Sequence, residues 1–161
     1  MRILRYSLTL CLLALFSFAA QAQLQFGGGI ATVGNFDQFG IQAKGQYALN
    51  DTWRVSADFT YLFPEAGTAW EINPNAHYIF SDDGAGKKLY ALAGLGIYHF
   101  GFNFDDGGLL GGLGNIGFTD VGLNVGAGAN IPVGNMAGYA EAKFGIGGSE
   151  IGLAIGILFG N

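Results

Sequence analysis

Strict alternation of apolar and polar residues is the feature that most limits the fold of this chain. In the stretch WRVSADFTYLF (residues 53–63), every second residue is apolar, and Arg54 and Asp58 lie on the opposite face. A period of two gives a β-strand with one apolar and one polar face. The pattern recurs in 39–49, 70–80, 119–131, 140–146 and 151–159, and less regularly in 24–33 and 89–100. We therefore expect eight strands, with Leu89, Ala91, Ala93, Leu95 and Ile97 on the apolar face of the fifth.

The first 22 residues have the features of an export signal. Two arginines precede an apolar run over 8–20, and the triplet Ala-Gln-Ala that ends at residue 22 is a small-x-small cleavage site. The alternative, a membrane anchor, requires about 20 apolar residues, and this run is shorter. We predict a secretory signal peptide over 1–22 and one domain over 23–161.

After residue 22 the chain is acidic and poor in charge. Five Lys and Arg residues remain there against 12 Asp and Glu, which argues against a nucleic-acid partner. Charged residues make up 12% of the whole chain, against about 25% in a typical soluble domain. No later stretch is apolar and long enough for a membrane helix. An exported, apolar chain of this kind favours a transmembrane β-barrel.

Two closed sheets fit the alternation, and they differ in which face points outward. A soluble, lipocalin-like barrel places its apolar face inside, whereas a membrane barrel places it toward lipid. The polar face here is mostly Gly, Asn, Gln, Ser and Thr, and Lys44 or Arg54 facing lipid would cost about 2–4 kcal/mol at mid-bilayer. We therefore predict an all-β, eight-stranded antiparallel transmembrane up-and-down barrel of the bacterial outer membrane. Aromatic residues near the strand ends form the expected interfacial girdle: Phe39, Tyr47, Trp53, Tyr61, Phe63, Trp70, Tyr78, Phe80 and Phe159.

The polar face then lines the lumen and carries a charge cluster. Its members are Lys44, Arg54, Asp58, Glu71, His77, Glu141 and Lys143. Pairing across the 50–52 turn places Lys44 opposite Asp58, and pairing across a 64–69 loop places Asp58 beside Asn75 and Ser56 beside His77. Inward glycines at 122, 126, 128, 152 and 156 leave room for long charged side chains. The cluster is either a set of mutually satisfied groups that hold a narrow barrel shut, or an ion path.

The chain resembles the small eight-stranded outer-membrane β-barrel family (OmpA/OmpX-like). The resemblance covers 23–161 and rests on three patterns: LNDTWRVSADFTYLF, LYALAGLGIY and the alternating end IGLAIGILF. It implies insertion by the barrel-assembly machinery, which in this family reads an aromatic residue in the last strand, here Phe159. Loops in the family often carry adhesion or defence functions. Gly101–Gly117 is read either as a mobile surface loop or as a segment that contacts lipopolysaccharide or a protein partner.

Catalytic and metal-binding patterns are weak. Ser56 and His77 could be neighbours in the lumen, and His99 lies near the outer rim, but no complete triad is recognisable. Asp105 and Asp106 alone do not make a calcium site, and we expect no metal or cofactor. We predict a non-enzymatic integral outer-membrane protein, in contact with lipid and lipopolysaccharide, with a largely plugged lumen and a structural or surface-interaction role. The alternatives are a narrow passive channel and, second, a lipid-modifying enzyme.

Overall fold

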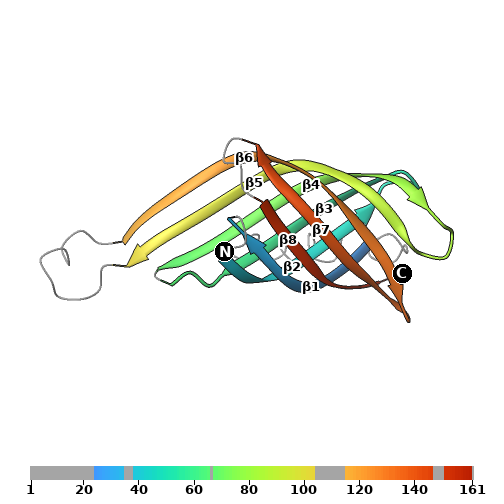
Figure 1. Ribbon diagram of the computed structural model, residues 1–161, viewed down its shortest axis with the longest axis horizontal. Coiled ribbons are helices and arrows are strands. Elements are labelled where there is room, and N and C mark those ends of the chain that lie inside the picture. Colours follow the sequence, from blue (N-terminus) through green and yellow to red (C-terminus); the bar gives the residue numbers. More distant parts are fainter. Residues whose placement is uncertain (1–23, 35–37, 66, 104–114, 147–150, 161) are drawn as a thin grey trace, which may run out of the picture.

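Eight antiparallel strands close into one barrel (Figure 1). The computed structural model describes residues 24–34, 38–65, 67–103, 115–146 and 151–160. The strands are β1 (Leu24–Val33), β2 (Gln38–Ala48), β3 (Trp53–Leu62), β4 (Thr68–Asp82), β5 (Lys88–Asn103), β6 (Asn115–Val133), β7 (Met136–Ile146) and β8 (Ile151–Phe159). Each strand pairs with its neighbours in sequence, and β8 pairs with β1 to close the sheet. The predicted eight-stranded up-and-down barrel is confirmed.

The barrel has two different ends. At the turn end, β1 begins, β8 ends, and short connections join β2 to β3, β4 to β5 and β6 to β7. The loop end holds the connections that follow β1, β3, β5 and β7. There β5 and β6 reach well beyond the other strands and project as a two-stranded hairpin (Figure 1).

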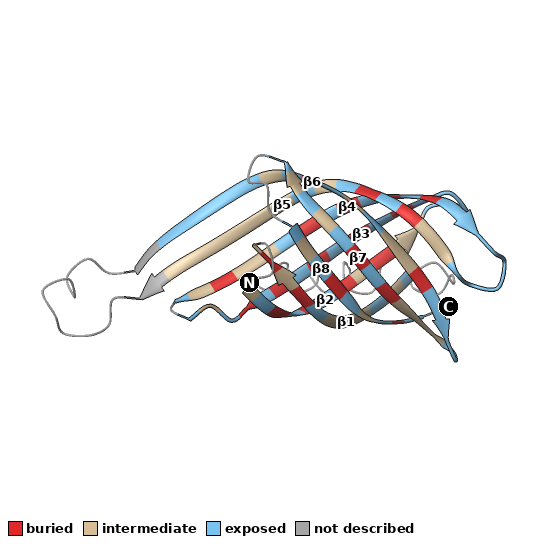
Figure 2. Ribbon diagram, in the orientation of Figure 1, coloured by how far each residue is buried: buried red, intermediate tan, exposed pale blue. Residues whose placement is uncertain are grey.

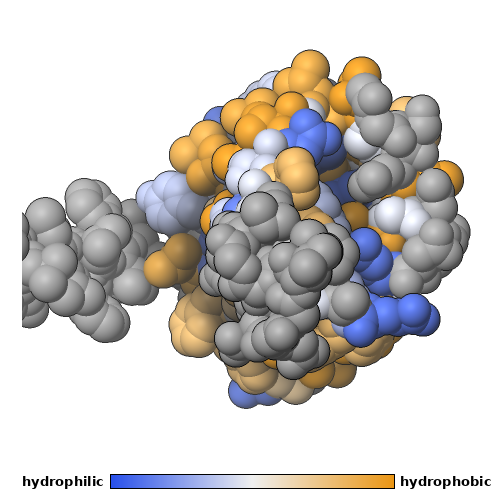
Figure 3. Space-filling model, turned by 90° about the vertical axis from the view of Figure 1, so that its left-hand side faces the viewer, coloured by the Kyte–Doolittle hydropathy of each residue, from blue (hydrophilic) through white to orange (hydrophobic). Residues whose placement is uncertain are grey.

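The apolar face of the sheet points outward. Along β3 exposure alternates strictly, so that the residues in phase with Trp53 are exposed and those in phase with Arg54 are buried (Figure 2). Large apolar side chains are exposed on every strand whose side chains are described, for example Phe26 at 63% and Val121 at 60%. Apolar residues also dominate the flank of the barrel seen from the loop end (Figure 3). Such a continuous apolar surface is far larger than the apolar patches that soluble monomers expose, and it is typical of a barrel whose outer face contacts lipid.

Among the described residues no helix has the length and apolar character needed to cross a membrane. In the fifth strand Ala91 and Leu95 are exposed whereas Tyr90 and Leu92 are buried, as its assigned facing predicts.

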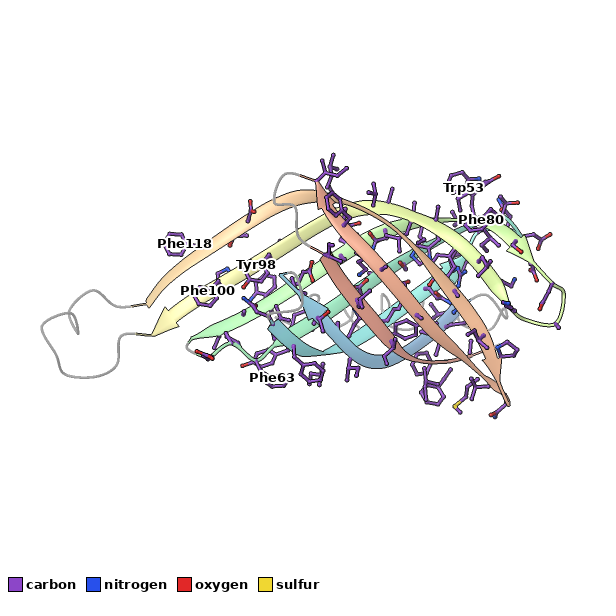
Figure 4. All side chains as sticks on the ribbon, viewed as in Figure 1. Trp53, Phe63, Phe80, Tyr98, Phe100 and Phe118 are labelled. Carbon is purple, nitrogen blue, oxygen red and sulfur yellow. The ribbon has the colours of Figure 1, made fainter. Side chains whose placement is uncertain are left out.

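The nine predicted girdle residues all lie on the outward face. Seven are exposed, and Tyr47 and Trp70 are half-buried. Trp53 and Phe80 lie toward the turn end, and Phe63 lies toward the loop end (Figure 4). Several girdle rings contact one another across strands: Trp53 packs edge-on against Tyr78, with ring centroids 5.2 Å apart. Two bands of aromatic rings are typical of barrels that span a bilayer.

One predicted strand register is correct and the other is wrong. Lys44 pairs with Asp58 between β2 and β3, as the short 50–52 turn requires. Between β3 and β4, however, Asp58 pairs with Asn73 rather than Asn75. β4 begins at Thr68, two residues before the alternation that starts at Trp70, so that Leu62 pairs with Ala69 and the register shifts by two residues. A shift by two keeps every side chain on its predicted face.

Inward glycines make room for tyrosine rings rather than for charged groups at two positions. Tyr90 pairs with Gly128, and a Cβ atom built on Gly128 would lie 2.6 Å from the Tyr90 ring. Tyr139 pairs with Gly156 in the same way, and a Cβ atom there would also lie 2.6 Å from the ring. Each ring therefore lies over bare backbone of the next strand, a packing that narrows the lumen.

Candidate functional site in the barrel lumen

Buried polar side chains fill the lumen along most of its length. They come from the inward faces of β2, β3, β4, β6 and β7. The buried polar residues are Gln42, Lys44, Gln46, Arg54, Ser56, Asp58, Thr60, Asn73, Asn75, His77, Asn124, Asn130 and Glu141. An apolar exterior around a polar interior inverts the arrangement of a soluble domain.

Two cation–carboxylate contacts cross the middle of the lumen. The Lys44 Nζ lies 2.7 Å from Glu141 Oε1, and the side chains of both are fully buried. The Lys143 Nζ lies 2.8 and 2.7 Å from the two carboxylate oxygens of Asp58. The predicted neighbours Lys44 and Asp58 are further apart, at 3.8 Å. The shortest ion pairs therefore join strands on opposite sides of the barrel, which pairing of adjacent strands could not predict.

Asp58 is the centre of this network. Besides the Lys143 contact, Asp58 Oδ1 accepts hydrogen bonds from Gln42 Nε2 at 3.1 Å and from Asn73 Nδ2 at 3.0 Å. The Asn73 Oδ1 in turn accepts from Asn124 Nδ2 at 3.1 Å. Buried charge is tolerated when it is paired and hydrogen-bonded in this way, whereas removal of one partner leaves an uncompensated charge.

A stack of flat side chains lies next to the network on the turn side. The His77 ring is parallel to the Tyr90 ring, with centroids 4.5 Å apart and planes inclined by 8°. The Tyr90 hydroxyl donates to Glu141 Oε1 at 2.7 Å. The Arg54 guanidinium carbon lies 4.9 Å from the Tyr90 ring centroid, within cation–π range. Tyr90 thus connects the central ion pairs to Arg54.

The contact between Ser56 and His77 does not make a catalytic triad. Ser56 Oγ and His77 Nε2 are 2.8 Å apart, although the two residues are not register partners. The other ring nitrogen, Nδ1, has no hydrogen-bond partner within the described residues, so no carboxylate orients the base. Both residues are buried, which keeps a lipid substrate away. His99 instead stacks on Trp70 and contacts Thr119 at 2.8 Å, with no serine among its contacts in the described chain.

The loop end of the lumen holds a cavity of about 110 Å³. Glu71 and Asp120 line it, together with Tyr98 and Asn124, and Lys143 lies at its inner side. Toward the same end, Tyr98 and Phe100 pack on a small buried cluster of Val33, Leu62 and Ala69. Glu71 thus lies at the loop-end cavity, whose wall also includes Lys143 of the central network.

The turn end holds a larger cavity of about 290 Å³. Arg54, Asn130 and Lys88 line it, and Asp51 is also part of its wall. Lys88 is paired with the exposed Asp82 at 3.0 Å. Hydrogen bonds from the Gly84 amide and from Lys88 lower the pKa of the Asp82 carboxyl below its ordinary value.

The seven predicted lumen residues therefore fall into three groups. Lys44, Asp58, His77, Glu141 and Lys143 converge in the central network. Arg54 lies at the turn-end cavity and Glu71 at the loop-end cavity. Sequence reasoning missed Tyr90 and Tyr139 as lumen residues, although the outward assignment of Ala91 already implied an inward Tyr90. The Tyr139 hydroxyl donates to Gln42 Oε1 at 2.8 Å.

Comparison with known proteins establishes the fold. No protein-family model matches the sequence, and neither does any curated protein sequence. Among solved structures, the N-terminal β-barrel domain of Pseudomonas aeruginosa OprF matches with a TM-score of 0.62 at 19% identity, over 86% of this chain and 98% of that one. Neisserial surface protein A also matches with a TM-score of 0.62, at 18% identity over 86% of this chain and 96% of that one.

A third match is Ail, the attachment invasion locus protein of Yersinia pestis, solved in complex with the heparin analogue sucrose octasulfate. Its TM-score is 0.57 at 19% identity, over 84% of this chain and 94% of that one. These low identities, combined with nearly complete coverage, show a shared architecture. The chain has the fold of the small eight-stranded outer-membrane barrels.

Proposed function

We propose that this chain is a non-enzymatic integral protein of the bacterial outer membrane with a closed lumen. In this proposal residues 1–22 direct export and are removed. The turn end then faces the periplasm and the loop end faces outward, as an even-stranded barrel with both termini on one side requires. The aromatic Phe159 in β8 suits recognition by the barrel-assembly machinery.

The observation that carries the proposal is the pair of ion contacts across the middle of the lumen. Lys44 to Glu141 and Lys143 to Asp58 join opposite walls, and the two carboxylates and Lys44 are at most 3% exposed. They lie between the two cavities, which are lined by different residues. An eight-stranded barrel is just wide enough for its interior side chains to fill it.

Conductance in a planar bilayer tests this function. The refolded barrel should give no discrete current steps, because the central network blocks a continuous water path. The double variant Lys44→Ala, Asp58→Ala should conduct if it stays folded, which heat-modifiable migration on a gel verifies. Reproducible steps from the unmodified barrel would contradict a closed lumen.

A narrow passive channel is the second candidate, and the two cavities favour it. They provide polar space at both ends of the lumen, about 110 Å³ at the loop end and about 290 Å³ at the turn end. Only the central network would have to rearrange for the cavities to join. The conductance measurement separates the two candidates, since a channel predicts steps without any substitution.

A surface-interaction role is supported by the β5–β6 hairpin. It projects at the loop end, and its Phe118 is 65% exposed (Figure 4). We propose that this hairpin and the connection between its strands contact lipopolysaccharide or a protein partner. A deletion of residues 104–114 should abolish such binding and leave the barrel folded.

The charge of the loop end argues against a polyanionic ligand such as the sulfated sugar analogue of the Ail complex. Outside the strands, the four loop-end connections contain Asp37, Glu65, Asp105, Asp106 and Glu150 but no Lys or Arg. Strong negative charge repels polyanions. Of the two partners, we therefore propose a neutral or cationic protein rather than lipopolysaccharide, whose phosphates are anionic, and we expect no retention of the barrel on a heparin column at physiological salt.

A further inference from the structure

The turn-end cavity contains buried hydrogen-bond donors that the described residues do not satisfy. Arg54 is 4% exposed, and its Nε and Nη2 atoms have no hydrogen-bond partner within the described residues. The Nδ2 of Asn130, which is 3% exposed, also lacks a partner there. Both residues line the same cavity of about 290 Å³. Buried polar groups are normally paired, so these donors require a partner from outside the described residues.

The geometry of Arg54 leaves one defined edge unused. Its Nη1 donates to Asn130 Oδ1 at 2.8 Å, and its flat face lies over the Tyr90 ring. These two contacts fix the plane of the guanidinium. The remaining Nε and Nη2 atoms form the edge that binds a carboxylate or phosphate through two parallel hydrogen bonds.

Within the described residues, Arg54 also lacks a counter-ion near the middle of the lumen. Of the cations Lys44, Arg54 and Lys143, the two lysines contact the buried carboxylates Glu141 and Asp58. Both carboxylates are already in contact with lysines. Within the described residues no carboxylate lies within ion-pair distance of Arg54. Water alone could complete the hydrogen bonds of the guanidinium but would not neutralise its charge.

We propose that the turn-end cavity is a binding site for a small oxyanion, a carboxylate or a phosphate, held by the free edge of Arg54 and by Asn130 Nδ2. Lys88 at the wall adds a second positive charge, although it is shared with Asp82. Asp51 also lines the cavity, and its negative charge weakens the attraction for anions there. The volume is close to the lower limit of small-molecule pockets, about 300 Å³, so a small anion with bound water fits.

Arg54 can be observed individually because it is the only arginine after residue 22. In the ¹⁵N-labelled, refolded barrel spanning 23–161, the Arg54 Nε–H gives the sole arginine side-chain signal. We expect this signal to shift saturably with inorganic phosphate or with acetate, and not with chloride at the same ionic strength. A stronger response to phosphate or to acetate would identify which of the two anions the site prefers.

Variants separate a built site from non-specific attraction. Arg54→Gln should weaken anion binding, measured by broadening of the phosphate or acetate resonance, by at least about tenfold, because a bidentate charge-assisted contact is lost. Lys87→Gln, which removes one exposed cation of the same turn outside the cavity wall, should leave binding unchanged. A signal that does not shift with either anion would overturn the proposal in favour of water alone. Broadening that persists in a folded Arg54→Gln barrel would overturn it in favour of non-specific attraction.

Discussion

The two ends of the lumen differ in charge and in size although one continuous sheet forms both. The loop-end cavity is small and contains the carboxylates Glu71 and Asp120. The turn-end cavity is more than twice as large and contains Arg54 and Lys88. Between them, Asp58 and Glu141 hold the lysines of the central network. The comparison teaches that the lumen has two chemically distinct recesses rather than a uniform polar lining, and in the proposed function the central network separates them as a closed partition.

Removal of the carboxylate that lies between the two ends should have the largest effect. Asp58→Ala leaves Lys143 without its short partner and Asn73 Nδ2 without its acceptor, and Gln42 Nε2 keeps only its bond to Thr60 Oγ1. We expect a loss of about 3–5 kcal/mol in the free energy of unfolding, since a buried charge becomes uncompensated. Urea titration in detergent micelles measures this, with the exposed Glu65→Ala as the control. A loss equal to that of the control would show that the network is dispensable.

A matched pair of cation replacements sharpens the contrast between paired and unpaired charge. Lys44→Met removes the short cation partner of Glu141, which keeps the Tyr90 hydroxyl and Lys143 at 4.0 Å, and should destabilise the barrel by about 3 kcal/mol or more. Arg54→Met removes a cation that has no carboxylate partner in the described chain, and we expect a change within about 1 kcal/mol. The same titrations give both values, in a buffer free of phosphate and carboxylates. Equal losses in the two variants would mean that Arg54 is compensated within the protein.

Removal of the Tyr90 hydroxyl, at the boundary of the turn-end recess, should cause a smaller loss of stability than the charge replacements. Tyr90→Phe keeps the ring over Gly128 and beside His77 but removes the hydrogen bond to Glu141. Loss of a hydrogen bond to a charged group should cost about 1.5–3 kcal/mol. The free energy of unfolding, obtained by urea titration, measures this loss. Tyr90→Leu, which also removes the ring, should cost more, and equal losses would assign the whole contribution to the hydroxyl.

The smallest effect concerns pH at the rim of the turn end. The pKa of Asp82 is lowered because Gly84 and Lys88 stabilise its charged form. A carboxyl whose pKa is lower in the folded state stabilises the fold fully at pH values above its ordinary pKa of about 3.9. This stabilisation is lost as the pH falls through the pKa of the folded state. Asp82→Asn should therefore lower the urea midpoint slightly at pH 7 and leave it unchanged at pH 2. The exposed Asp51→Asn is the control, and a difference that persists at pH 2 would refute a charge effect.

Sequence alternation was sufficient for the wall of the barrel but not for its interior. Alternation about Trp53 fixed the facing of the strand, since a period of two permits only two orientations and the charges exclude one of them. The short 50–52 turn also fixed the pairing of Lys44 with Asp58. The loop around Pro64 has no such tight geometry, and the predicted register there was wrong by two residues.

Contacts across the lumen could not be predicted from pairing rules. Lys44 and Glu141 are 97 residues apart in sequence, and their 2.7 Å contact depends on the stagger and tilt of the closed sheet. The packing of Tyr139 over Gly156 likewise requires the observed register of β7 and β8. The inward glycines showed where the lumen has space for a side chain from another strand, but not which side chain would fill that space.

The separation of the two recesses can be measured directly with single cysteines, because the chain has no cysteine after residue 22. Asp120→Cys lies at the loop-end cavity and Ala48→Cys at the turn-end cavity. In proteoliposomes with barrels inserted in one known orientation, a small membrane-impermeant thiol reagent should modify each cysteine from one side only, and from opposite sides. Modification of both cysteines from the same side would show that the lumen is open through the central network, and it would contradict the closed partition.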